Sequence, residues 1–336
     1  MQQEKQRDYL FDNFKALLII LVVLGHFLEP NYRNNPILFE LKWAIFSVHM
    51  PAFIFVSGYF SKKKASFEKL IKGIAIPYVV YELAYYVLYH MIGKETTFSL
   101  HRPKFSLWYL MGLFVWKLVT PYFSKIPGNM VLAMIAGLLI GLTDYDNFFS
   151  IPRIVYFFPF FLAGMRFERS MLNRLRCKAC KVVAAIVLVA GMLYLCLDQI
   201  HRSMPVQIFY GRYSYEVMGQ SALCGMRIRL LCYVISFVLT YAIIIWIPQK
   251  QTMLSYMGQR TMAIYIFHGL LYSAVHFKLS MLSAVDTNAE AALLITGCIA
   301  LTFVLSAKPF TMITDLVASV PIEKLTRITH DSKNRE

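Results

Sequence analysis

Ten apolar stretches, each close to the length of a membrane-crossing helix, follow one another along the 336-residue chain. A bilayer core about 30 Å thick is crossed by roughly 20 residues of α-helix. Lipid offers no hydrogen bonds to the backbone, so a crossing segment satisfies its polar groups within its own helix. We therefore predict an all-α integral membrane protein with about ten transmembrane helices. The predicted spans are residues 14–30, 41–60, 74–92, 105–121, 128–144, 151–167, 181–197, 225–247, 260–277 and 289–307.

The amino-acid composition agrees with a chain that folds in lipid. Hydrophobic residues make up 58% of the chain and charged residues 16%, whereas soluble domains are about 45–50% apolar and 25% charged. So few polar residues cannot cover the surface of a soluble protein of this size. This excludes a cytosolic enzyme, a secreted disulfide scaffold and a disordered chain. We expect one membrane domain over residues 1–307, followed by an interfacial or cytoplasmic tail over residues 308–336.

The formal net charge of +15 is explained by membrane topology rather than by nucleic acid. Membrane proteins concentrate Lys and Arg in their cytoplasmic loops. With the spans above, 21 of the 34 basic residues lie on the amino-terminal side of the membrane and 10 on the opposite side. This asymmetry predicts that both termini are cytoplasmic. We expect a multi-pass protein of the cell (inner or plasma) membrane, with the lipid bilayer as a partner and no nucleic-acid partner.

The cysteine spacing does not indicate a metal site. Cys177 and Cys180 form one CxxC pair in a basic loop, and neither a second pair nor a group of histidines follows it. A structural zinc site needs four such ligands. The other cysteines lie mostly in apolar runs, where a thiol behaves as a small hydrophobic group. We expect no bound metal and no permanently bound cofactor.

Three histidines lie within the predicted spans, and titratable groups at that depth are candidates for function because burying them in lipid is costly. His26 lies in the outer half of the first span, whereas His49 and His268 lie near the middle of the second and ninth spans. Their similar depth allows the three rings to approach one another. A neutral imidazole can take up a proton near neutral pH, as a general base must. The alternative is a histidine that hydrogen-bonds neighbouring helices for packing.

Other ionisable residues accompany these histidines. Lys15 precedes His26 by eleven positions, which is about three helical turns, so both residues lie on one face of the first span. Lys15 can also extend to the cytoplasmic interface, and Asp12 can cap the start of the helix. Glu82 in the third span and Arg153 at the outer end of the sixth are suited equally to structural ion pairs and to substrate contacts.

The stretch from Phe11 to His26 contains a basic residue, ten intervening positions and a histidine, which are Lys15 and His26. This pattern resembles the opening signature of the membrane acyltransferase-3 family, in particular its fucose-4-O-acetylase-like branch. Four further stretches agree and follow in the family's order. They are Phe46-Ser47-Val48-His49-Met50-Pro51 to Ser57-Gly58-Tyr59-Phe60, then Leu107-Trp108-Tyr109-Leu110, then Tyr156 to Gly164, and finally Ile264-Tyr265-Ile266-Phe267-His268.

The resemblance implies a stand-alone membrane O-acetyltransferase. Members of the family have about ten helices and transfer an acyl group, commonly acetyl, from acyl-CoA to a sugar hydroxyl. Such a protein would use acetyl-CoA as a co-substrate, and its acceptor would be a cell-envelope carbohydrate or a lipid-linked glycan. A thioester is a better acyl donor than the oxygen ester that is formed, so the transfer needs neither ATP nor a metal.

The resemblance and the residue chemistry together suggest roles for the candidate residues. We expect His26 to be the general base, with His49 and His268 binding the thioester carbonyl, relaying the proton or stabilising the oxyanion. Contacts to the anionic CoA are expected from four basic residues near the cytoplasmic face, Lys15, Lys62, Lys63 and Arg166. Contacts to the acceptor are expected from Asp12, Glu82, Trp108 and Arg153.

Three other functions fit some of these observations. A secondary transporter also places histidines at mid-membrane, but transporters are commonly built from internal repeats, and none is visible here. A membrane sensor or scaffold would need no acyl donor. A membrane N-acyltransferase would use the same donor and transfer the acyl group to an amine. The cytoplasmic basic clusters are explained by membrane topology even without CoA.

Overall fold

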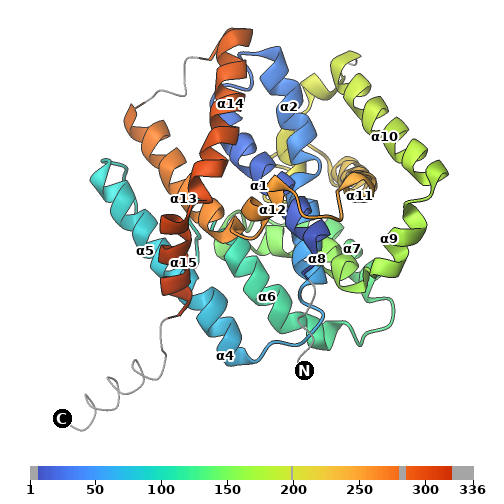
Figure 1. The fold of residues 1–336 in the computed structure, drawn as a ribbon, viewed down its shortest axis with the longest axis horizontal. Helices are drawn as coiled ribbons and strands as arrows, with labels where there is room; N and C mark the ends of the chain where they lie inside the picture. Colours follow the sequence, from blue (N-terminus) through green and yellow to red (C-terminus); the bar gives the residue numbers. More distant parts are fainter. Residues whose placement is uncertain (1–6, 198–199, 280–284, 320–336) are drawn as a thin grey trace.

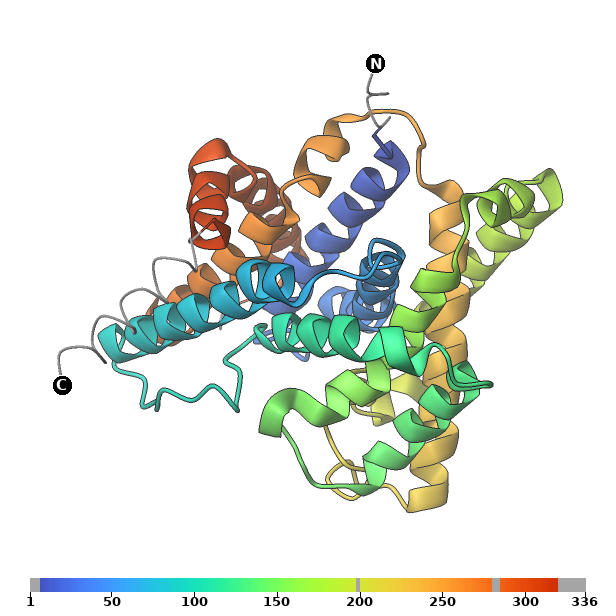
Figure 2. The ribbon, with the colours of Figure 1, turned by 90° about the horizontal axis from the view of Figure 1, so that it is seen from below.

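The computed structural model describes residues 7–197, 200–279 and 285–319, which fold into α-helices and short 3₁₀ and π turns without a β-strand. Figure 1 shows α1 near the centre of the molecule with other helices around it, and Figure 2 shows the same arrangement from below. The α-helices are α1 (Tyr9–Leu28), α2 (Pro36–Phe46), α3 (His49–Tyr59), α4 (Phe67–Leu70), α5 (Ile76–Met91), α6 (Trp108–Phe123), α7 (Asn129–Leu139), α8 (Ile151–Arg166), α9 (Arg169–Leu175), α10 (Lys178–Leu197), α11 (Ala222–Trp246), α12 (Met253–Gly258), α13 (Thr261–Ala274), α14 (Asn288–Leu305) and α15 (Lys308–Ala318). The short turns are η1 (Ile71–Ala75), η2 (Ile140–Leu142), η3 (Phe148–Ser150), η4 (Ile200–Ser203), η5 (Val206–Phe209) and η6 (Val275–Leu279).

Helix length and composition support a multi-pass membrane protein. Within the described ranges, 7 helical segments are long and apolar enough to cross a bilayer. They are Tyr9–Leu28, Pro36–Tyr59, Phe67–Met91, Phe148–Arg166, Lys178–Leu197, Ala222–Trp246 and Asn288–Leu305. The predicted spans 105–121, 128–144 and 260–277 contain the shorter helices α6, α7 and α13. In α10, most apolar side chains are exposed, as expected of a helix that contacts lipid.

Helix α1 is held at its amino-terminal end by one buried amide, that of Asn13. Its Nδ2 donates to the carbonyls of Pro248 and Lys250, both at 2.9 Å. Its Oδ1 accepts from the hydroxyls of Thr252 and Ser255, both at 2.6 Å. All the hydrogen-bonding capacity of this side chain is thus used within the protein, as burial of an amide requires. The segment between α11 and α12 is thereby fastened to the start of α1.

The second predicted span is a broken helix, and the break has a local cause. Helix α2 ends at Phe46 and α3 begins at His49, two residues before Pro51. Proline has no N–H, so Pro51 cannot donate to the carbonyl of Ser47 four residues earlier. The hydroxyl of Ser236 on α11 donates to that carbonyl instead, at 2.7 Å. The carbonyl of Ser47 therefore keeps a hydrogen-bond partner at the break. His49 is the first residue of the new helix.

Helices α3 and α8 cross with their backbones in contact because two glycines face each other there. A Cβ added at Gly58 would lie 2.0 Å from the carbonyl oxygen of Phe161, and one at Gly164 would lie 1.8 Å from the carbonyl oxygen of Phe55. No side chain other than that of glycine fits at either position. Small residues at such crossings are the usual means of close helix packing in membranes. This crossing brings α8 against the helix that begins at His49.

The structure describes the first part of the predicted tail, residues 308–319 of 308–336. Helix α15 covers Lys308–Ala318 and packs against α13 and α5, and Figure 1 shows it beside both. Residues 320–336 of that tail lie outside the described residues. The interfacial placement of the tail remains a prediction.

Candidate active site

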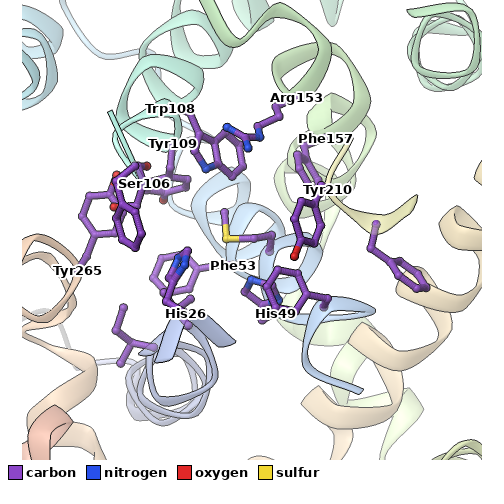
Figure 3. Close-up of a pocket in the computed structure, with 16 residues that line it drawn as sticks. His26, His49, Phe53, Ser106, Trp108, Tyr109, Arg153, Phe157, Tyr210 and Tyr265 are labelled. Atoms are coloured by element: carbon purple, nitrogen blue, oxygen red, sulfur yellow. The ribbon is translucent and has the colours of Figure 1, made fainter. Parts of the chain in front are cut away.

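A cavity of about 110 Å³ lies between α1, α2, α3, α6, α8, α13 and the segment 205–210. Most of its wall is aromatic, and the polar side chains in it come from elements that are distant in the sequence. Figure 3 shows His26 and His49 on one side of the cavity and Arg153 beside Trp108 on the opposite side. The aromatic residues of the wall are Phe46, Phe53, Phe105, Trp108, Tyr109, Phe157, Phe209, Tyr210 and Tyr265.

His26 contributes an imidazole to the cavity from the last turn of α1. Its ring centre lies 4.5 Å from that of Phe105 and 5.4 Å from that of His268. The side chain of His26 is only partly buried, and the remaining exposure faces a cavity that a ligand can fill. The predicted approach of these two histidines is therefore observed, across α1 and α13.

His268 is completely buried in α13 and lies beside His26 without lining the cavity. Its Nδ1 lies 2.9 Å from the carbonyl oxygen of Ile264. A carbonyl only accepts hydrogen bonds, so Nδ1 carries the proton and Nε2 keeps a free lone pair in the neutral ring. Nε2 has no hydrogen-bond partner among the described residues. His268 thus presents Nε2 as a hydrogen-bond acceptor next to the ring of His26.

His49 has the same arrangement at the helix break. Its Nδ1 lies 2.8 Å from the carbonyl oxygen of Ile45, the last turn of α2, and its ring makes an edge contact with Phe46 at 4.8 Å. The ring is 4% exposed, and it lines the cavity. The hydrogen bond from Nδ1 leaves Nε2 as the acceptor atom of the neutral ring. The break before Pro51 therefore orients a second imidazole in the same cavity.

Arg153 and Trp108 form the opposite wall. The guanidinium of Arg153 lies 5.1 Å from the centre of the Trp108 ring, and Trp108 stacks on Phe157 at 5.5 Å. Arg153 Nη1 donates a long hydrogen bond of 3.4 Å to Asn147 Oδ1. A cation over an indole face is favourable, but less so than a full ion pair at a buried position. This part of the wall therefore combines a positive charge with a stacking surface.

The comparisons with known proteins show the family of the chain. Residues 8–307 match the family described as "Acyltransferase domain". The chain belongs to the acyltransferase-3 family. It is similar to the nodulation protein NolL of Sinorhizobium fredii (strain NBRC 101917 / NGR234), with 27% identity over 182 residues. The matched part covers 49% of this chain and 50% of NolL, so the chain spans about half the length of this curated relative. No solved structure matches the chain significantly.

The family match and the apolar helices together make this chain a multi-pass membrane member of the acyltransferase-3 family. Within α1, Lys15 lies in the second turn and His26 in the last turn. Lys15 Nζ forms an ion pair with Asp12 Oδ1 at 3.0 Å, and Arg7 Nε reaches Asp12 Oδ2 at 2.8 Å. Eleven helical residues separate Lys15 from His26 by about 16 Å. Neither Lys15 nor Asp12 lines the cavity.

The other predicted CoA contacts lie near the carboxyl-terminal ends of α3 and α8. Lys62 donates to the carbonyl of Phe167 and lies over the ring of Tyr59 at 4.6 Å. Arg166 donates to the side-chain oxygen of Asn129. Lys63 is exposed. None of these three cations lines the aromatic cavity.

Glu82 does not lie in the cavity but supports one of its walls. Its carboxylate accepts from Lys104 Nζ at 2.8 Å and from the Lys104 backbone N–H at 3.0 Å. Lys104 Nζ also donates to the carbonyl of Thr97. This buried pair fastens the irregular segment between α5 and α6. The next residue is Phe105, whose φ of +47° is unfavourable for a bulky side chain and which contacts His26.

Several residues of the cavity were not among the candidates from the sequence. Phe105, Tyr210 and Tyr265 line it, and only for the last two was there a signal. Tyr265 lies in a stretch that resembles the family, and Tyr210 lies in the aromatic segment between α10 and α11. Tyr210 stacks on Phe46 at 4.8 Å, and its hydroxyl donates to Glu29 at 3.1 Å. Burial, together with the carboxylate of Glu29 beside it, raises the pKa of Tyr210 above its ordinary value.

No group of three or more His, Cys, Asp or Glu side chains that could hold a metal occurs in the part of the chain that the structure describes. Cys177 and Cys180 lie close together at the start of α10 and at the surface.

Proposed function

We propose that this membrane acyltransferase is an O-acetyltransferase that moves the acetyl group of acetyl-CoA to a hydroxyl of a cell-envelope sugar or a lipid-linked glycan. The observation that carries the proposal is the position of His26 in the aromatic cavity with the buried acceptor His268 beside it. A hydroxyl needs a base before it can attack a thioester. Aromatic walls suit the apolar faces of a sugar ring.

The proposed topology has ten membrane crossings with both termini in the cytoplasm of the cell (inner or plasma) membrane. Under the positive-inside rule, Lys15 and the basic residues near the ends of α3 and α8 face the cytoplasm. His26 then lies in the outer half of α1, and Arg153 lies at the outer end of α8. Acetyl-CoA would approach from the Lys15 end of α1, and the sugar acceptor from the outer side.

The proposed reaction is a direct transfer. His26 removes the proton from the acceptor hydroxyl, whose oxygen attacks the thioester carbonyl carbon and forms a tetrahedral oxyanion. The C–S bond then breaks, the oxygen ester is formed, and the departing thiolate of CoA takes the proton from the His26 imidazolium. His268 would accept a hydrogen bond from His26 and so orient its ring.

His49 has a more restricted choice of roles than the sequence alone allows. Because its Nδ1 donates to the carbonyl of Ile45, a neutral His49 offers a ligand only Nε2, which accepts a hydrogen bond but cannot donate one. In this form His49 would accept a hydrogen bond from the hydroxyl of the sugar substrate or relay a proton. It can stabilise an oxyanion or polarise the thioester carbonyl only after it has been protonated at Nε2.

The remaining candidates would bind the two substrates. The exposed cations Lys62, Lys63 and Arg166 would contact the CoA phosphates, and Lys15 would add positive potential. Asp12 would hold Lys15 in position. Trp108 and Arg153 would contact the sugar acceptor, whereas Glu82 would act on the cavity through Lys104 and Phe105.

The test is acetyl transfer by the purified protein in lipid nanodiscs with radiolabelled acetyl-CoA. Matched acceptors should be used, for example a methyl hexoside and the corresponding aminohexoside. We expect a product that is cleaved by mild base, as an oxygen ester is. A base-stable amide formed only with the amine would identify an N-acyltransferase. Release of no CoA with any acceptor, together with uptake of a sugar into proteoliposomes, would instead identify a transporter.

A further inference from the structure

Arg153 is the one lysine or arginine in the wall of the cavity, as far as the described residues show. The rest of the wall is aromatic and aliphatic, apart from Ser106 and the imidazoles of His26 and His49. A cation in such surroundings loses much of its hydration and needs an opposite charge or strong acceptors in its place. The partners of Arg153 therefore bear directly on what the cavity holds.

The protein itself provides Arg153 with few partners. Its contacts are the face of Trp108 and one long hydrogen bond to Asn147. In the ranges that the structure covers, no carboxylate forms an ion pair with it. A guanidinium has five N–H donors in a planar fork. Most of these donors are left for a ligand.

The carboxylates on the same side of the molecule are engaged by other cations. Asp146 accepts two hydrogen bonds from Arg212, at 2.7 and 3.1 Å. Glu29 is paired with the completely buried amine of Lys42. Arg153 is thus a positive charge in the cavity wall with no direct ion pair among the described residues, and Asp146, the carboxylate that interacts with it electrostatically, is already hydrogen-bonded to Arg212.

We propose that Arg153 binds an oxyanion, a phosphate or carboxylate group, that is carried by the acceptor close to the hydroxyl that is acetylated. This inference rests on the proposed acetyltransferase function. The fork of a guanidinium matches both groups bidentately. His26 and His49 lie across the cavity from Arg153 (Figure 3), so the charged group and the reacting hydroxyl would occupy opposite sides of one ligand.

The position of Arg153 assigns this anion to the acceptor rather than to CoA. Arg153 lies in the first turn of α8 and Arg166 is its last residue, so about 20 Å of helix separates the two guanidinium-bearing positions. The CoA phosphates are proposed to lie at the Arg166 end, with Lys62 and Lys63. A second anion site at the far end of the same helix therefore belongs to the other substrate.

The experiment compares binding of three matched ligands to the protein in nanodiscs by isothermal titration calorimetry. The ligands are methyl glucoside, methyl glucuronide and glucosyl phosphate, which are neutral, carboxylate-bearing and phosphate-bearing. We expect the charged ligands to bind about 10- to 100-fold more tightly than the neutral one, as hydrogen bonds to a charged group usually give. The ranking of carboxylate and phosphate then identifies the group that the acceptor carries.

Two variants of Arg153 and one matched control complete the experiment. Arg153→Gln should remove the preference for charged ligands, and Arg153→Lys should keep part of it because the charge remains without the fork. Arg227→Gln, which changes an exposed arginine outside the cavity wall, should leave the preference unchanged. Equal binding of the three ligands by the unmodified protein would overturn the inference, and so would a preference that survives in Arg153→Gln.

The outcome for the inference is separable from that for the proposed function. Arg153-dependent binding of a charged sugar without any acetyl transfer would support the inference and contradict the function. Acetyl transfer to neutral and charged sugars with equal kcat/KM, lowered alike by Arg153→Gln, would support the function and overturn the inference.

Discussion

The rings of His26 and His268 lie with their centres 5.4 Å apart and their planes inclined at 33°, although the two residues come from the first and the thirteenth α-helix. The hydrogen bond from His268 to Ile264 leaves Nε2 of His268 as an acceptor. A neighbouring ring nitrogen of His26 that carries a proton is a suitable donor for it, which would leave the other nitrogen of His26 free to act as a base. This arrangement parallels the way a third group orients the base in other acyl-transfer enzymes.

The first prediction concerns His26 itself. Its replacement in His26→Ala should lower acetyl transfer by about 10²- to 10⁴-fold, the usual contribution of a general base. The measurement is incorporation of label from acetyl-CoA in membranes that contain equal amounts of the two proteins. Thermal stability in detergent should stay near that of the unmodified protein because the ring borders a cavity. Activity within about tenfold of the unmodified protein, or 1.4 kcal/mol of barrier, would show that His26 is not the base.

The second prediction tests whether His268 acts through His26. If it does, His268→Ala should lower kcat by about 10²-fold, and the double variant with His26→Ala should be no slower than His26→Ala alone. Residues that act as one unit are strongly non-additive in this way. The measurement is a double-mutant cycle on kcat, with acetyl-CoA binding measured alongside. Multiplicative losses in the double variant would mean that the two histidines act independently.

The third prediction concerns the close crossing of α3 and α8. A methyl group at Gly164 would overlap the carbonyl oxygen of Phe55, and backbone atoms cannot rotate away from it. Gly164→Ala should therefore destabilise the protein by about 1–3 kcal/mol, as overpacking does. The matched control is Gly191→Ala in α10, where nothing lies within 4 Å of the added carbon. Thermal unfolding in detergent should show a lower midpoint for the first variant only, and an unchanged midpoint for Gly164→Ala would contradict the crossing.

The fourth prediction is that the contribution of the Asp146–Arg212 ion pair to stability depends on pH. The hydrogen bonds from Arg212 hold the pKa of Asp146 below its ordinary value. A carboxyl whose pKa is lower in the folded than in the unfolded protein stabilises the fold above its unfolded pKa, about 3.9, and loses this effect as the pH falls through its folded pKa. Asp146 is partly exposed, so the effect is modest.

Asp146→Asn should therefore be less stable than the unmodified protein at neutral pH, and the difference should shrink below about pH 4. The measurement is the unfolding midpoint in detergent as a function of pH. Asp144→Asn is the control, because Asp144 is exposed and forms no ion pair within the described ranges. A difference between Asp146→Asn and the unmodified protein that stays constant across the acid range would contradict the assigned pairing.

Much of the architecture follows from local sequence. Apolar stretches of membrane-crossing length fold as helices because lipid leaves the backbone no other partner, and each predicted span contains helical residues in the structure. Pro51 favours a break in the second span, because a missing N–H is a local property. Pro51 alone does not place the break at Ser47 and Val48, where the carbonyl of Ser47 accepts a hydrogen bond from Ser236 of α11.

The sequence by itself determined which chemistry is present: imidazoles at membrane depth, basic residues concentrated near one face, and motifs that identify the family. Only the tertiary structure decided which of these groups meet. It brings His268 to His26, pairs Glu82 with Lys104, and leaves Arg153 without a direct ion pair among the residues that the structure describes. The physical reason is that an ionisable group in a membrane needs a partner, and the choice among distant partners is made by how the helices cross and not by the residues next to it in the chain.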